Sequence, residues 1–148
     1  MAEMSKELMD LINSVPCCYW ATASKGGVPN VAAAGSTVAV SPDTIIGAGI
    51  FVGKTLQNLR ENPKAMVLVH SAPPPKAEFS MGTLAPVTGA QIRGSVTLQT
   101  SGDMHEQMKN MVAQVLGTEA AEMVKTTLVL KVEEIYSVKA LEPGKRIA

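Results

Sequence analysis

Apolar and polar residues alternate along most of this chain with the two-residue period of β-strands. Glycine turns such as "KGG" at residues 25–27, and the "SPD" turn at 41–43, separate the alternating runs. The pattern predicts six strands, at residues 17–24, 28–40, 44–52, 64–70, 90–100 and 127–141.

Helical spacing of apolar residues interrupts the strands in a few places. It predicts helices at residues 3–14, 54–62 and 103–115. Asp103 would cap the last of these, and residues 118–126 follow as a second short helix. Neighbouring strands are joined as hairpins, and helices occur only at these points, so the chain does not repeat a βαβ unit. The pattern therefore favours an antiparallel barrel with helices packed outside it.

The segment from 71 to 89 has no periodicity and carries four prolines. A structureless stretch of this length is unusual in a compact domain and is more often functional or mobile. Nothing else divides the chain, and its 148 residues are enough to bury one core. We therefore expect a single domain, residues 1–148, that is mainly β with peripheral helices.

The charge balance and the cysteines exclude several classes of protein. Lysine and arginine total 13 against 13 aspartate and glutamate, which removes the basic surface of a nucleic-acid binder. No apolar run is long enough to cross a bilayer, and early acidic residues argue against a signal peptide. Cys17 and Cys18 are adjacent, so we expect neither a bridge between them nor a cysteine zinc site. These features predict a reduced, cytoplasmic protein, and zero net charge favours an oligomer.

A cation and a hydroxyl stand at the junction between the third strand and the following helix, in "FVGKTLQNLRENP". A helix N-terminus has unpaired N–H groups and about half a positive charge. Lys54 adds a full charge, Thr55 adds a donor, and Gly53 lets the backbone come close to a ligand. Together they fit a phosphate site. Ordinary helix capping explains the same residues, and the spacing of a Walker A loop is absent.

Two neighbouring strands carry unusually small residues. On the second strand Ala32, Ala33, Ala34, Gly35 and Ser36 follow Val31, and on the third strand Gly47, Ala48 and Gly49 precede Ile50. Such residues bury little in a core but let a flat ligand or another backbone approach closely. The pattern fits a slot for a planar phosphorylated cofactor, and equally tight packing within the sheet or in a dimer.

Several single residues leave a choice between structural and functional roles. Arg93, within the fifth strand, either pairs at the sheet surface or approaches a cofactor. Trp20 fits the core, a dimer interface or a stacking position near a cofactor. His70 and His105 form no recognisable arrangement with serine and aspartate, so no catalytic residue can be named. The methionines of the 103–115 helix fit a core better than a cofactor site.

The motifs follow one another in a characteristic order. They are "ATAS", "PNVAAAGSTVAV", "GKTLQNLRENPKAMVLV", "QIRGSVTL" and "LVLKVEEIYSVKALEPGKRI". This order resembles the FMN-binding split-barrel family related to pyridoxamine 5'-phosphate oxidase, in its short form, and is similar to the small FMN-binding proteins of anaerobic bacteria. The resemblance extends from about Met9 to Ile147, and its most specific part is the lysine followed by "NLRENP" after a strand.

The resemblance implies a six-stranded antiparallel split barrel that forms a homodimer, with two FMN sites at the subunit interface. By position, Lys54 and Thr55 would hold the FMN phosphate, and residues 31–36 would lie along the ring and ribityl chain. Main-chain groups of residues 47–50 would contact the ring. Gly53 and Arg93 complete the candidate cofactor residues, and the partner subunit would supply further contacts.

The chain departs from the oxidase itself in three places. It has Ala32 near the position of an oxidase arginine, and only Gly53-Lys54 where the oxidase has a basic pair. The tail "PGKRIA" replaces an arginine-rich C-terminal substrate motif. Oxidation of vitamin B6 is therefore not expected.

We expect an FMN-dependent oxidoreductase or flavin-based electron carrier that acts on a small molecule or an electron-transfer partner. In such a protein the flavin carries the redox chemistry, and the chain supplies binding and orientation. Two other hypotheses share the fold: a non-catalytic protein that binds or stores flavin or haem, and a deazaflavin-dependent reductase. The 71–89 loop is a candidate cover for the exposed edge of the ring.

Overall fold

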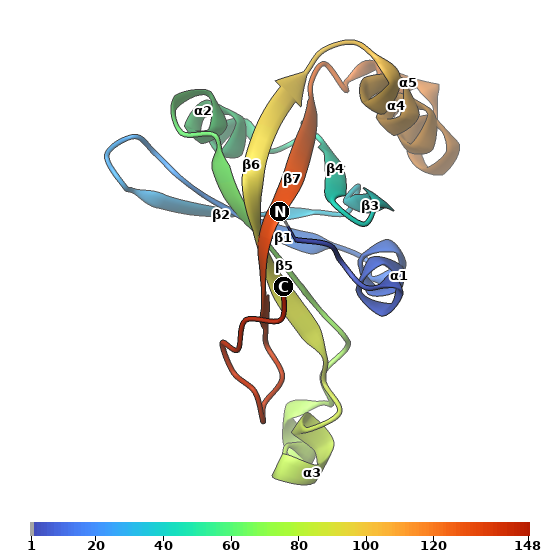
Figure 1. Cartoon of the computed structure of the whole chain (residues 1–148). Helices are drawn as coiled ribbons and strands as arrows, with labels where there is room; N and C mark the ends of the chain where they lie inside the picture. Colours follow the sequence, from blue (N-terminus) through green and yellow to red (C-terminus); the bar gives the residue numbers. More distant parts are fainter. Residues whose placement is uncertain (1) are drawn as a thin grey trace.

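The computed structural model of the chain describes residues 2–148. Its main body is one antiparallel sheet of seven strands, curled into a half-barrel with helices around it (Figure 1). The strands are β1 Cys18–Ala23, β2 Pro29–Ala34, β3 Val38–Ser41, β4 Thr44–Ala48, β5 Lys64–His70, β6 Gly89–Gln99 and β7 Thr127–Ser137. Their order is β2-β1-β5-β6-β7-β4-β3, so β2 and β3 are the edge strands. The predicted class, mainly β with peripheral helices, is confirmed.

The sheet has seven strands instead of the predicted six, because the run expected at 28–40 is two strands. Gly35 and Ser36 form a turn between them, where the chain passes from one edge of the sheet to the other. The Thr37 hydroxyl fixes this turn: it donates to the Ala34 carbonyl at 2.8 Å and accepts from the Trp20 indole N–H at 2.9 Å. The residues on both sides of the turn are small, so the alternation of apolar and polar positions does not change there and does not reveal the turn.

Five α-helices and one short 3-10 helix lie around the sheet in the described part of the chain. They are α1 Lys6–Ser14, α2 Gly53–Glu61, η1 Lys76–Glu78, α3 Met81–Leu84, α4 Asp103–Leu116 and α5 Thr118–Glu122. The predicted cap at Asp103 is wrong, because Gly102 is the N-cap residue of α4, with a φ of 95°. Asp103 is the first helical residue instead, where its negative charge suits the positive end of the helix dipole.

The core consists of two separate clusters. The larger fills the inner face of the half-barrel, where Trp20, Val67 and Leu130 are at most 1% exposed. The smaller joins Met108 and Val112 of α4 to residues of β4. Because the two clusters are separate, the space between α4 and the turn after β2 is not filled by the larger one.

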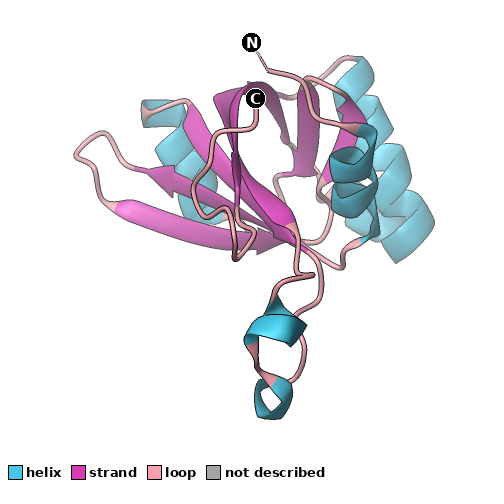
Figure 2. Ribbon diagram, turned by 60° about the horizontal axis from the view of Figure 1, so that its bottom comes forward, coloured by secondary structure: helices cyan, strands magenta, loops and turns pink. Residues whose placement is uncertain are grey.

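The segment between β5 and β6, here called the arm (residues 71–88), stands away from the body in both views (Figures 1 and 2). It is more ordered than the sequence predicts, since it contains η1 and α3. Ser80 and Thr83 form a capping box at the start of α3. His70 is the last residue of β5, which coincides with the strand predicted at 64–70. None of the described helices is both long and apolar enough to cross a membrane.

Candidate functional site

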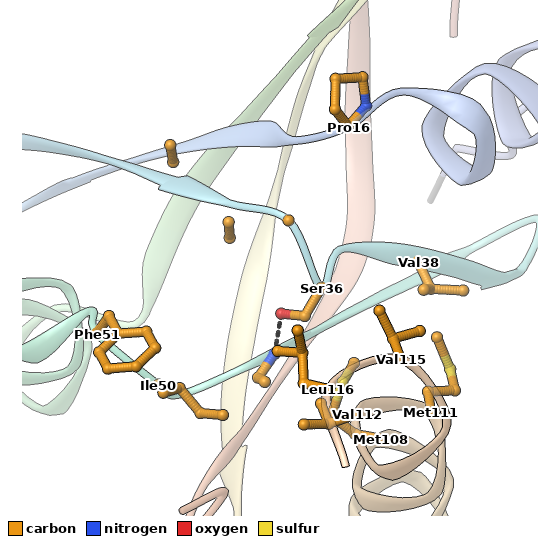
Figure 3. Close-up of a pocket in the computed structure, with 14 residues that line it drawn as sticks. Pro16, Ser36, Val38, Ile50, Phe51, Met108, Met111, Val112, Val115 and Leu116 are labelled. Atoms are coloured by element: carbon orange, nitrogen blue, oxygen red, sulfur yellow. Dashed lines mark hydrogen bonds between the residues drawn. The ribbon is translucent and has the colours of Figure 1, made fainter. Parts of the chain in front are cut away.

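A cavity of about 400 Å³ lies between the turn after β2, the end of β4 and α4 (Figure 3). One side is formed by Pro16, Ala33, Ala34, Gly35, Ser36, Val38, Ala48, Ile50 and Phe51. The α4 side is formed by Met108, Met111, Val112, Val115 and Leu116. Six of the predicted cofactor residues, at 33–36, 48 and 50, therefore come together around one cavity.

The turn after β2 is held over the cavity by short-range contacts. The Ser36 Oγ accepts from the backbone N–H of Ala48 at 3.0 Å, which ties the turn to the end of β4 (dashed line in Figure 3). A Cβ on Gly35 would lie 3.1 Å from the Pro16 carbonyl, so a glycine lets the turn pack closely against the chain before β1. These contacts fix the strip of residues 33–36 opposite the end of β4.

The methionines of α4, predicted to belong to the core, divide between the core and the cavity. Met108 is 0% exposed and belongs to the smaller core cluster, although it also reaches the cavity. Met111 is half-buried and lines the cavity, and Val115 and Leu116 are 80% and 66% exposed at its mouth. The apolar stripe of α4 is wider than packing on the sheet requires, and this excess is visible in the sequence.

Phe51 is a lining residue that was not among the predicted cofactor residues. It is the one non-glycine residue with positive φ in the described chain, at 60°, and its side chain is 87% exposed. A bulky residue in the left-handed region is strained, and such strain collects at functional sites. Its ring lies across the cavity from α4 (Figure 3).

The N-terminus of α2 has hydrogen-bond donors without partners. The N-cap residue Val52 offers no side-chain bond, no acidic residue lies in the first turn, and the first helical bond runs from the Leu56 N–H. The N–H groups of Gly53, Lys54 and Thr55 therefore have no partner within residues 2–148. The Lys54 side chain is exposed, and a Cβ on Gly53 would meet nothing within 4 Å. Free N–H groups, the helix dipole and a lysine together suit an anion such as a phosphate.

The Thr55 hydroxyl does not belong to this open end of the helix. The residue is 1% exposed, and its hydroxyl accepts from the Asn30 amide at 3.2 Å. Asn58, also 1% exposed, donates to the Thr22 hydroxyl at 3.1 Å. These two buried contacts hold α2 on the β1–β2 hairpin, so Thr55 offers an anion its main-chain N–H group.

Contacts within the chain explain why Gly47 in β4 and Gly49 just after it are glycines. A Cβ on Gly47 would come within 3.1 Å of the Trp20 ring, and one on Gly49 within 2.7 Å of the Thr126 carbonyl. Val31 and Ala32 lie on β2 outside the cavity lining. Because β2 is an edge strand, half of its backbone groups face away from the sheet.

Arg93 is an exposed residue of β6 and does not line the cavity. Its guanidinium pairs with Glu134 at 2.8 Å and lies 5.5 Å from the centre of the Tyr136 ring. The Tyr136 hydroxyl and the positive charge of Arg93 lower the pKa of the Glu134 carboxyl. The structure therefore gives Arg93 the paired surface position that was one of its two alternatives.

The remaining candidates have structural surroundings. Trp20 is a core residue, 1% exposed. Cys18 is equally buried, and burial raises the pKa of its thiol to about 12, so the thiol stays protonated. His105 is 5% exposed and its Nδ1 lies 2.8 Å from the Thr127 hydroxyl, which links α4 to β7.

Residues 4–139 match the family model described as pyridoxamine 5'-phosphate oxidase, and the chain belongs to this family. This match confirms the resemblance drawn from the motifs. None of the curated proteins matches the chain.

Solved structures show the same fold. HupZ from Group A Streptococcus is 22% identical, covers 98% of this chain and 99% of its own, and has a TM-score of 0.75. An FMN-binding protein from Syntrophomonas wolfei is 21% identical, with coverage of 93% and 87% and a TM-score of 0.75. HutZ, the heme storage protein from Vibrio cholerae, is 16% identical, with coverage of 95% and 99% and a TM-score of 0.64. At these identities the similarity establishes the fold alone.

Proposed function

We propose that this protein binds FMN and works as a flavin-dependent oxidoreductase or electron carrier, as a cytoplasmic homodimer. The observation that carries the proposal is the N-terminus of α2. It offers three free N–H groups and Lys54, and it lies just beyond Phe51 at the cavity rim. Membership of the pyridoxamine 5'-phosphate oxidase family and the fold shared with an FMN-binding protein support the same proposal.

In this proposal, different residues of the site bind different parts of FMN. Gly53, Lys54 and Thr55 hold the phosphate through main-chain N–H groups and the lysine ammonium. The strip of residues 31–36 and the end of β4 lie along the ribityl chain and the ring, mainly through backbone groups. The bound flavin supplies the electron or hydride transfer, and the chain positions it and keeps water from one side of it.

The homodimer is supported by apolar residues on the outer face of the sheet. The register places Val31, Ala21 and Met66 in one row across β2, β1 and β5, and Ala33, Tyr19 and Leu68 in the next. Val31 is 65% exposed, and two apolar residues of the arm, Phe79 and Met81, are also exposed, at 48% and 64%. Apolar residues gathered on one open face are typical of a surface that a second subunit covers.

Haem binding is the second candidate function, favoured by the fold that the chain shares with the heme storage protein HutZ. The two candidate functions predict different roles for Lys54. The phosphate tail of FMN would need Lys54 and the N-terminus of α2, whereas haem has no phosphate. A deazaflavin with a phosphorylated tail would use the same end of α2 as FMN. Absorption spectra of the purified protein with each ligand added in turn distinguish the three.

The test is a titration of the full chain with FMN and with riboflavin, which lacks the phosphate. Lys54→Ala should weaken FMN binding about 10- to 100-fold, the size of a hydrogen bond to a charged group, while riboflavin binding stays within about twofold. Lys139→Ala, another exposed lysine, is the matched control and should change neither. Equal weakening of both flavins, or no FMN binding by the unaltered protein, would refute the proposal.

A further inference from the structure

We propose that the cavity beside α4 binds an uncharged, apolar small molecule, which meets the flavin at the strip of residues 33–36. This inference rests on the proposed function, because it assigns the class of molecule that reaches the flavin. It goes beyond that function, because the family match and the solved structures say nothing about a ligand at α4. It also differs from what the family name implies, since pyridoxamine 5'-phosphate is a charged molecule.

The chemistry of the lining excludes a charged occupant. No lysine, arginine, histidine, aspartate or glutamate of residues 2–148 lines the cavity. Ser36 is the one lining residue with a polar side chain, and its oxygen already accepts from the Ala48 N–H. An ionised group that entered this cavity would lose water and find no charged partner, which is unfavourable. The part of the ligand that enters must therefore be neutral and apolar.

The shape of the cavity favours a small molecule over the surface of another protein. The most deeply placed lining residues, Ala48, Met108 and Val112, are at most 5% exposed. At the mouth, Phe51 and Val115 are 87% and 80% exposed. A flat protein surface would cover the mouth and leave the floor empty, whereas a volume of about 400 Å³ is within the usual range of small-molecule pockets.

The two walls differ in a way that suits a ligand next to a ring. The strip 33–36 is narrow, with side chains no larger than a serine, so a planar group can lie close to its backbone. The opposite wall has Met108 and Met111, whose unbranched side chains adapt to differently shaped partners. The cavity therefore fits a range of apolar ring compounds and does not demand a single shape.

The test compares two probes with one ring skeleton. N-phenyl-1-naphthylamine is neutral, and 1-anilinonaphthalene-8-sulfonate adds one sulfonate. The FMN-loaded protein should bind one neutral probe per chain in equilibrium dialysis, and the sulfonate at least about tenfold more weakly because its charge must be desolvated. Equal binding of the two probes, or binding of neither, would overturn the proposal.

A pair of substitutions locates the probe. Met111→Glu places a carboxylate in the α4 wall and should weaken the neutral probe at least about tenfold. Met123→Glu is the matched control, since Met123 is 50% exposed and does not line the cavity, and it should change binding less than about twofold. If Met111→Glu fails to fold, methyl spectra of the methionines decide: the probe should shift Met108 and Met111 and leave Met81 and Met123 in place.

Three further outcomes separate this inference from the proposed function. A probe that binds the FMN-free protein and is expelled by FMN would mean that the flavin ring fills the cavity, which refutes the inference and leaves FMN binding intact. A dimer that dissociates in Met111→Glu would mean that a second copy fills the cavity, which also refutes it. Probe binding at the cavity without any FMN binding would refute the proposed function and leave an apolar ligand site.

Discussion

Two helices flank the candidate site, and they are attached to the same sheet by different mixtures of polar and apolar contact. α2 is held by two polar pairs, Asn58 with Thr22 and Thr55 with Asn30, together with Leu59 in the larger apolar cluster. Its N-terminus stays open, with Lys54 exposed. α4 is held mainly by the apolar cluster around Met108, with one polar contact between His105 and Thr127, and its last turns leave apolar side chains around a cavity.

The difference shows how one strip of chain can serve two unlike ligands. Polar contacts beneath α2 fix the direction of its free N–H groups, which a charged group needs because hydrogen bonds depend on angle. Apolar contacts beneath α4 require only a close fit of shape, which suits a neutral group. The strip 33–36 connects the two environments, so the proposed flavin and the proposed apolar ligand would meet along it, one from each side.

Loss of the apolar anchor of α4 should have the largest effect on stability. Met108→Ala removes a side chain that is 0% exposed and should destabilise the protein by about 2–4 kcal/mol in urea unfolding, through lost burial and an enlarged cavity. The ratio of FMN to riboflavin affinity should stay unchanged, because the α2 end is attached separately. Met123→Ala, at a 50% exposed position, serves as the control. A changed ratio in Met108→Ala would show that the two helices are not independent.

Loss of the polar anchor of α2 should come next. Thr22→Val removes the acceptor of the Asn58 amide, whose Oδ1 already lacks a partner among the described residues, and should cost about 1–3 kcal/mol. Adding Asn58→Leu should restore much of the loss, since a pair of apolar side chains leaves no unpaired amide. The exposed Thr97→Val should change stability by less than about 0.5 kcal/mol. A double variant less stable than Thr22→Val would contradict this account of the α2 anchor.

The smallest effect on stability is expected at acid pH, and it concerns the β3–β4 hairpin. This hairpin brings β4 to the side of the site where α4 lies. Hydrogen bonds from the Ser41 and Thr44 hydroxyls, helped by the charge of Lys131, lower the pKa of Asp43 from 3.8 to about 2. Because the folded pKa is the lower one, the carboxylate stabilises the fold above pH 3.8, and this contribution disappears as the pH falls towards 2.

Asp43→Asn should therefore flatten the loss of stability between these pH values, measured by urea unfolding at several pH values. The lowered pKa values of Glu133 and Glu134 act in both proteins, so the difference between the two curves isolates Asp43. Parallel curves would show that the hairpin does not depend on this carboxylate.

Much of the fold could be predicted from the sequence, because its strands and helices carry clear periods. The alternation of apolar and polar residues located the segments that form strands, but it merged β2 and β3 into one run. The turn at Gly35 and Ser36 was missed because the residues on both sides of it are small. The helix predicted at 103–115 agrees with α4 within a residue or two. Its N-cap residue was predicted wrongly, because the spacing of apolar residues carries no information about the positive φ of Gly102. The order inside the arm was missed because its short helices depend on local capping by Ser80 and Thr83.

The candidate site was predicted in part, and its gaps have physical causes. Residues of one continuous strip, such as 33–36, can be recognised together because their small size is a local property. The α4 wall lies some 75 residues further along the chain, so only the folded sheet brings Met111 opposite Ala33. Thr55 carries a donor in the sequence, but the direction of its side chain follows from its buried contact with Asn30.

The order of strands in the sheet has a consequence for how the protein folds. β2 and β3 follow each other with three residues between them, yet they stand at opposite ends of the sheet, with the other five strands between. We expect the turn at Gly35 and Ser36 to take its final form only when the sheet has curled, because it joins the two edges of the sheet. A ligand that binds this strip would therefore act on the folded protein, which it would stabilise by mass action.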